Sequence, residues 1–163
     1  MSQTMKLLFL STLFSLFMIN TGYAADSLII SDSRIPEAPP GAQVMAGFMS
    51  IQNPTQQPIE ITSVSSPAFN TVEMHLSKEV NGIAKMLPQK SLSIPANSTL
   101  ALQPGGYHLM LIKPKQAMRD GDSVLIEFSL SNNTSLSLHT PVKKNNGKKM
   151  RDMKCGAGKC GGN

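Results

Sequence analysis

The chain has 163 residues, a length that allows one domain with short appendages. Hydrophobic residues make up 40% of it and charged residues 15%, which excludes a disordered polyelectrolyte and a multi-span membrane protein. The formal net charge of +5 would suggest a nucleic-acid or anionic-membrane partner if it were spread over the fold.

The first 24 residues have the pattern of a secretory signal. Lys6 precedes an apolar run of 12 residues at 7–18, and Gly22 and Ala24 are the small residues of a cleavage site. The run is shorter than the about 20 residues of a spanning helix, so we expect cleavage after Ala24, export to the periplasm and no stable membrane insertion. No cysteine follows the cut, so a lipid anchor is not indicated. An uncleaved N-terminal anchor is the alternative.

The positive charge is concentrated at the C-terminus. Residues 143–163 carry seven basic residues and one acidic residue, whereas residues 25–142 carry seven basic and nine acidic residues. The body is therefore mildly acidic, and the tail has no aromatic side chain on which a base could stack. We expect no nucleic-acid partner.

The body, residues 25–142, has the pattern of β-strands throughout. Its β-branched or alternating runs are separated by Pro, Gly and Asn clusters. Asn81-Gly82 is the strongest hairpin signal. The pattern predicts a single all-β domain over 25–142, an antiparallel β-sandwich or barrel. The expected strands are residues 27–30, 44–52, 59–65, 72–76, 83–87, 92–94, 99–102, 107–112, 124–130 and 135–139.

This body contains no cysteine, which excludes thiolate zinc sites, cysteine catalysis and a cysteine-ligated blue-copper site within it. His108 and Met110 lie two apart in an expected strand, so they project from the same face about 6.6 Å apart. The hairpin folds Met86 back beside the strand of His75. Two imidazoles and two thioethers form a soft, neutral ligand set that suits Cu(I).

The other methionines and the third histidine have simpler readings. An isolated Met in a β-protein is usually core filler, which we expect of Met45, Met49 and Met118. We expect His139 to be a surface or hydrogen-bonded residue and not a ligand.

The spacing of the four candidate ligands matches a known pattern. His75, Met86, His108 and Met110 resemble the H-x10-M-x21-H-x-M signature of the periplasmic copper chaperone family often written PCuAC. The similarity covers most of the body. It extends to residues 34–41, 49–53, 72–75 and 104–110.

The resemblance implies a cupredoxin-like β-sandwich that binds one Cu(I) and delivers it to the binuclear copper centre of cytochrome c oxidase, whose subunit II or a Sco-type thiol protein would be the acceptor. It implies no enzymatic activity, and no nucleophile or base cluster stands out. The family often has Met directly after the first His, where this chain has Leu76. Met74 precedes that His and should face away from it, so it is not taken as a ligand.

The basic tail, residues 143–163, contains a second candidate copper site formed by Cys155, Cys160, Met150 and Met153. Neighbouring lysines favour thiolate, and the Lys-Cys-Gly-x-Gly-Lys-Cys-Gly string is similar to repeats in small bacterial copper-sequestering polypeptides. The two cysteines could instead form a small-loop disulfide, and the lysines could simply be solvated.

Three functions remain open at this stage. The leading one is a monomeric periplasmic Cu(I) metallochaperone. The second is a copper buffer that sequesters without delivering, suggested by the thiol tail. The third is a metal-free β-sandwich binding module, which the strand pattern alone allows.

Overall fold

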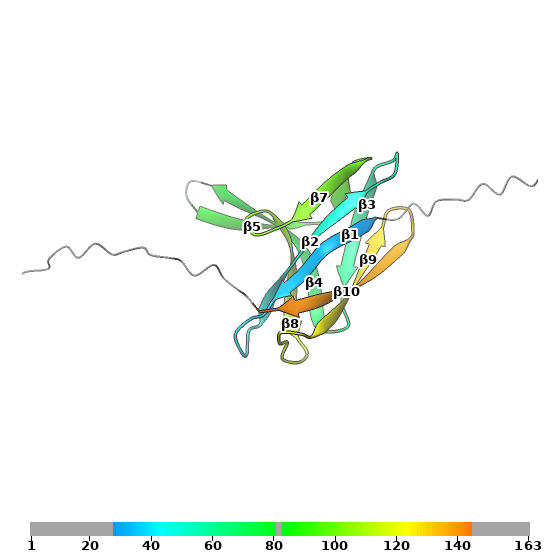
Figure 1. Ribbon diagram of the computed structural model, residues 1–163. Coiled ribbons are helices and arrows are strands. Elements are labelled where there is room, and N and C mark those ends of the chain that lie inside the picture. The colour runs from blue at the N-terminus through cyan, green and yellow to red at the C-terminus, as the bar shows by residue number, and fades with distance from the viewer. Residues whose placement is uncertain (1–27, 81–82, 145–163) are drawn as a thin grey trace, which may run out of the picture.

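The computed structural model describes residues 28–80 and 83–144. All regular structure in these residues is β, which confirms the predicted fold class (Figure 1). The ten strands are β1 Ile29–Pro36, β2 Val44–Asn53, β3 Ile59–Ser65, β4 Phe69–Val80, β5 Ile83–Gln89, β6 Leu92–Ile94, β7 Ser98–Leu102, β8 Tyr107–Pro114, β9 Ser123–Leu130 and β10 Ser135–Lys143.

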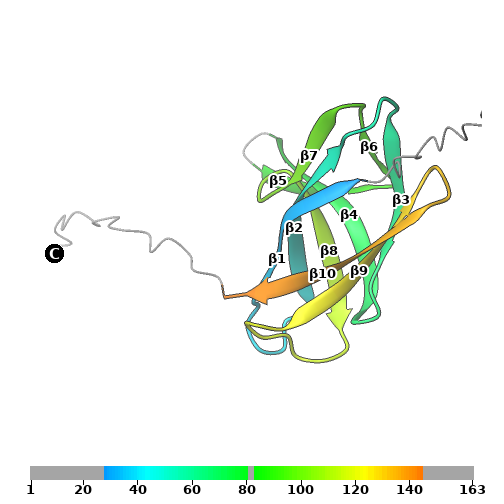
Figure 2. The same cartoon turned by 45° about the vertical axis from the view of Figure 1, so that its right-hand side comes forward.

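The strands form one sheet in the order β5-β4-β8-β7-β2-β1-β10-β9-β3-β6, with a further pairing of β8 to β2. The sheet curls into a nearly closed barrel, so that β1 and β10 cross one side and β4 and β8 the other (Figure 2). Most neighbours are antiparallel, as predicted. Two short contacts are parallel, β1 with β10 and β7 with β8.

The predicted strands agree with the observed ones in number and order, and two agree in both bounds, β3 and β6. β4 is longer than predicted at both ends. Its polar residues 77–79 show no strand pattern, but the ladder to β5 on one side keeps them extended. β1 runs on to Pro36 through a register shift between Ser31 and Arg34, where Asp32 has a φ of 52°. The predicted strand ends at residue 30, whereas the observed strand continues through this bulge.

The core fills the barrel interior from both halves of the sheet, with Phe128, Ile51, Leu109 and Ile126 among its most buried side chains. Met45, Met49 and Met118 are buried in it, as predicted. Met74 is also a core residue, which confirms that it points away from the neighbouring histidine face. His139 is exposed, as predicted.

Three sequence predictions fall outside the described residues. These are the signal segment 1–24, the Asn81-Gly82 turn and the second copper site in the tail beyond residue 144. The pairing of β4 with β5 up to Val80 and Ile83 confirms the hairpin itself. Within the described residues, no helix is long and apolar enough to cross a membrane.

Asn53 holds the β2–β3 connection against β6. It is fully buried, and its Nδ2 donates to the carbonyls of Gln57, Ile94 and Pro95 at 2.8, 3.0 and 3.2 Å. Its Oδ1 accepts from the amide and hydroxyl of Thr55. Because buried carbonyls lose free energy when left unpaired, this one amide stabilises the whole corner.

Asn53→Ala should lower the free energy of unfolding by about 2–4 kcal/mol, because it leaves buried carbonyls without donors. Urea unfolding of the metal-free protein measures this. Asn132→Ala is the matched control, since Asn132 also accepts from the threonine two residues on but is exposed. A loss for Asn53→Ala no larger than for the control would contradict the assigned role.

Candidate metal centre

The register between β4 and β8 brings the two body histidines together. His75 lies directly opposite His108 in this antiparallel pair. Their neighbours Met74 and Leu109 belong to the core, so strand alternation turns both imidazoles toward the other face of the sheet. The predicted convergence of these two residues, 33 positions apart in the chain, is therefore present.

Both rings are buried although they do not belong to the apolar core. The relative exposure is 8% for His75 and 6% for His108. The ring centroids lie 5.9 Å apart with the planes tilted by 47°. A metal ion about 2 Å from an imidazole nitrogen lies about 3 Å from the ring centre, so two rings at this separation can share one ion.

The backbone fixes the orientation of His108. Its Nδ1 lies 3.1 Å from the carbonyl oxygen of Gly106, to which it donates. That carbonyl is placed by the Pro104-Gly105-Gly106 turn, where Gly105 takes a φ of 79° that side chains disfavour. With the proton on Nδ1, the Nε2 of His108 carries a free lone pair.

A carboxylate fixes the orientation of His75 through the other ring nitrogen, Nε2. Its Nε2 lies 2.8 Å from Oε2 of Glu73, so Nε2 is the protonated nitrogen facing an anionic acceptor. Its Nδ1 is buried and has no hydrogen-bond partner. An unpaired buried acceptor costs free energy, and a bound cation would relieve that cost.

The two methionines lie on the same face as the histidines but differ in exposure. Met110 pairs with Glu73 and is half-buried, whereas Met86 on β5 pairs with Ser77 on β4 and is 61% exposed. Both are diagonal cross-strand neighbours of His75, a separation that long side chains span. The outer part of the β4–β5 hairpin extends beyond the barrel wall (Figure 1).

Among the described residues, no three His, Cys, Asp or Glu side chains gather closely enough to hold a metal ion. The further soft donors that the described residues offer on this face are the thioethers of Met86 and Met110. Such a set favours a soft monovalent ion over hard divalent cations.

Comparison with known proteins places the chain in a family. A family model described as "Putative lipoprotein LpqE-like" matches residues 28–142. The chain belongs to the LpqE-like family. This family is part of the PCuAC-like group, which confirms the resemblance drawn from the histidine and methionine spacing.

Individual proteins similar to this LpqE-like chain include a lipoprotein by name and two solved copper-bound structures. The "Putative lipoprotein Lxx21020" of Leifsonia xyli subsp. xyli is 29% identical over 75% of this chain and 73% of its own length. The solution structure of the Cu(I) form of DR1885 from Deinococcus radiodurans is 27% identical, with a TM-score of 0.57 over 72% of this chain and 78% of that one. The copper-bound PCuAC domain from PmoF2 has the same fold, with a TM-score of 0.61 at 16% identity over 72% and 92%.

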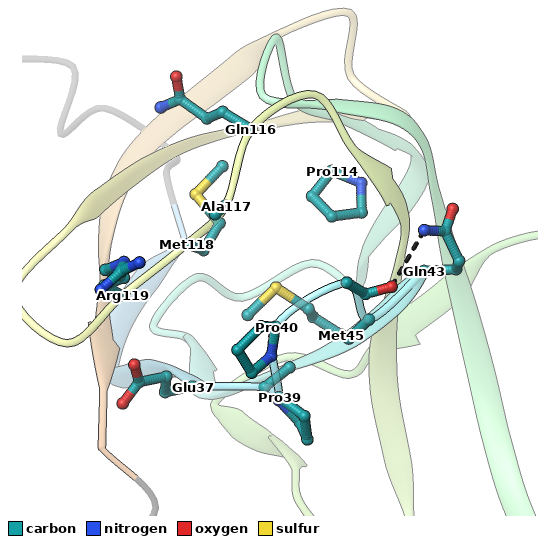
Figure 3. A pocket seen from close by; sticks show the side chains of 13 residues that line it. Glu37, Pro39, Pro40, Gln43, Met45, Pro114, Gln116, Ala117, Met118 and Arg119 are labelled. Atoms are coloured by element: carbon teal, nitrogen blue, oxygen red, sulfur yellow. Dashed lines mark hydrogen bonds between the residues drawn. The ribbon is translucent and has the colours of Figure 1, made fainter.

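The LpqE-like domain also has a cavity of about 310 Å³ that is separate from the histidines. It is lined by the Pro39-Pro40-Gly41 loop, the segment after β8 and the buried Met45 and Met118 (Figure 3). Glu37 and Arg119 are its charged lining residues. None of the four predicted ligands lines it, so the Pro-Pro-Gly motif shapes a different part of the molecule.

Sequence reasoning missed two groups that orient the ligands, the Glu73 carboxylate and the Gly106 carbonyl. The signal for Glu73 was present, because residues two apart in a strand share a face and Glu73 precedes His75 by two. The signal for Gly106 was not, since a backbone carbonyl has no identity in the sequence.

His75→Leu should leave the metal-free LpqE-like domain as stable as the wild type, within about 1 kcal/mol, or more stable. The substitution removes a buried acceptor without a partner, and this gain offsets the lost hydrogen bond to the half-exposed Glu73. Urea unfolding tests this. Leu109→Ala, on the core face of β8, calibrates the assay with a loss of about 2–5 kcal/mol. A comparable loss for His75→Leu would mean that the ring serves packing.

Proposed function

We propose that the mature protein is a Cu(I) metallochaperone that holds one ion between His75, His108, Met110 and Met86. The observation that carries the proposal is the buried, unpaired Nδ1 of His75 opposite His108, with thioethers on the same face. The Cu(I) form of the 27%-identical DR1885 supports copper as the ion. The protein is a binding protein and not an enzyme.

The donor set accounts for the oxidation state. Thioethers and neutral imidazoles are soft ligands, and none of them must lose a proton from its ordinary state to bind. Without thiolates the ion is held less tightly than by a cysteine site. An acceptor with cysteine ligands can then take the ion by stepwise ligand exchange.

The exposure of the ligands suggests a direction for this exchange. Met86 lies at the edge strand and is mostly exposed, whereas the two histidines are buried. An incoming thiolate would displace the Met86 thioether first and the imidazoles last. We propose that the acceptor is the binuclear copper site in subunit II of cytochrome c oxidase, or a Sco-type protein that serves it.

We further propose that the protein works as a monomer in the periplasm. Its relatives bear lipoprotein names, which supports export to the cell envelope. The first cysteine of this chain is Cys155, so we propose release after signal cleavage in place of lipid attachment.

Anaerobic Cu(I) titration against a chromogenic chelator tests the binding site. Cys155→Ser and Cys160→Ser remove the tail thiols. The mature chain with both substitutions should bind one Cu(I). Adding His108→Ala with Met110→Ala should weaken binding by more than about 100-fold, because even outer partners of metal ligands cost about 10–100-fold. His139→Ala is the matched control and should leave the affinity unchanged.

Absence of binding by the thiol-free chain would contradict the proposal and favour a metal-free binding module. Binding that survives the double substitution would move the site elsewhere in the molecule.

A copper buffer is the second candidate, favoured by the Cys155 and Cys160 pair in the tail. The two functions differ in transfer. A chaperone should load the metal-free copper domain of an oxidase subunit II faster than chelated Cu(I) at the same free concentration. Stopped-flow ultraviolet absorbance of the Cu(I)–thiolate bonds that form in that domain measures the rate under anaerobic conditions, and equal rates would favour the buffer.

A further inference from the structure

The two histidines of the metal centre are held through different ring nitrogens. Gly106 accepts from Nδ1 of His108, whereas Glu73 accepts from Nε2 of His75. Each contact leaves the other nitrogen of its ring with a lone pair. The free nitrogens are therefore Nε2 on His108 and Nδ1 on His75.

The partner of His75 differs in kind from that of His108. A backbone carbonyl is fixed by the turn that contains it, but the Glu73 side chain is 44% exposed and is present only because the sequence supplies it. Glu73 and His75 lie two apart on β4, where the ladder to β8 is in regular register, so their side chains share one face. An ionised carboxylate only accepts hydrogen bonds, so it selects the Nε2–H form of the ring.

Burial makes this choice consequential. The Nδ1 atom of His75 is buried and unpaired, so no hydrogen bond on that side restrains the ring or its proton. The only hydrogen bond of the ring among the described residues is the one to Glu73. Without it, a proton on Nδ1 would remove the lone pair of that nitrogen, and a rotation of the ring about χ2 would move it.

We propose that Glu73 is a positioning residue that holds His75 as the Nε2–H tautomer, so that His75 binds copper through Nδ1 while His108 binds through Nε2. The inference rests on the proposed copper site and adds the coordinating atom of each histidine. A carboxylate that is hydrogen-bonded to a ligand imidazole also raises the donor strength of the imidazole. The negative charge of the carboxylate balances the positive charge of the bound cation.

Long-range ¹H–¹⁵N correlation spectra of the metal-free protein, at a pH where the rings are neutral, report the tautomers directly. The wild type should show His75 as Nε2–H and His108 as Nδ1–H. Glu73→Ala should convert His75 to a mixture of tautomers and leave His108 unchanged. A wild-type His75 protonated on Nδ1 would overturn the proposal, whether or not copper binds.

Cu(I) competition titrations give the second readout. Glu73→Ala should weaken binding by about 10–100-fold, the usual effect of removing the partner of a ligand histidine. Glu73→Gln, which keeps an acceptor oxygen but no charge, should fall between Glu73→Ala and the wild type. Glu79→Ala is the matched control, because Glu79 is an exposed carboxylate further along the same face of β4 with no contact to His75.

The outcomes separate this inference from the proposed function. If the wild type binds no Cu(I), the proposed function fails, while the tautomer spectra still decide the role of Glu73 in orienting the ring. If the wild type binds Cu(I) but Glu73→Ala binds equally well with an unchanged His75 spectrum, the positioning role fails and the copper site stands. Urea unfolding of each variant confirms that it is folded.

Discussion

The antiparallel register of β4 against β8 is the constraint on which the candidate site depends. It sets His75 opposite His108 and keeps Met74 and Leu109 in the core. Because the side-chain period of a strand is two, a slip of one residue would exchange these sets and bury imidazoles in the barrel interior. The apolar core therefore enforces the position of the polar pair, and the energy that folds the barrel also builds the site.

The site combines two buried histidines with one exposed methionine. The two imidazoles are buried, and the Gly106 carbonyl and the Glu73 carboxylate fix their orientation. Met86 stands on the edge strand β5, mostly in solvent. Two pre-oriented nitrogens and an accessible thioether suit a site that binds an ion selectively and then releases it. This is the behaviour we propose for Cu(I).

Much of this protein follows from its sequence alone. Alternating apolar residues and Pro, Gly and Asn punctuation predicted all ten strands in order, because strand period and turn chemistry are local properties. The position of each charge separated a basic tail from an acidic body. The His-x10-Met-x21-His-x-Met spacing predicted which family the body belongs to and which four side chains are the candidate ligands.

Only the tertiary structure decided the rest. The parallel contact of β1 with β10, the full length of β4 and the curl of the sheet arise from pairings between distant segments, which no local pattern encodes. The site has the same division. The sequence determined that His75 and Met110 were candidate ligands, because residue type is enough for that. The structure decided which ring nitrogen is free, because that depends on a carboxylate and a carbonyl held within hydrogen-bond distance by the folded sheet.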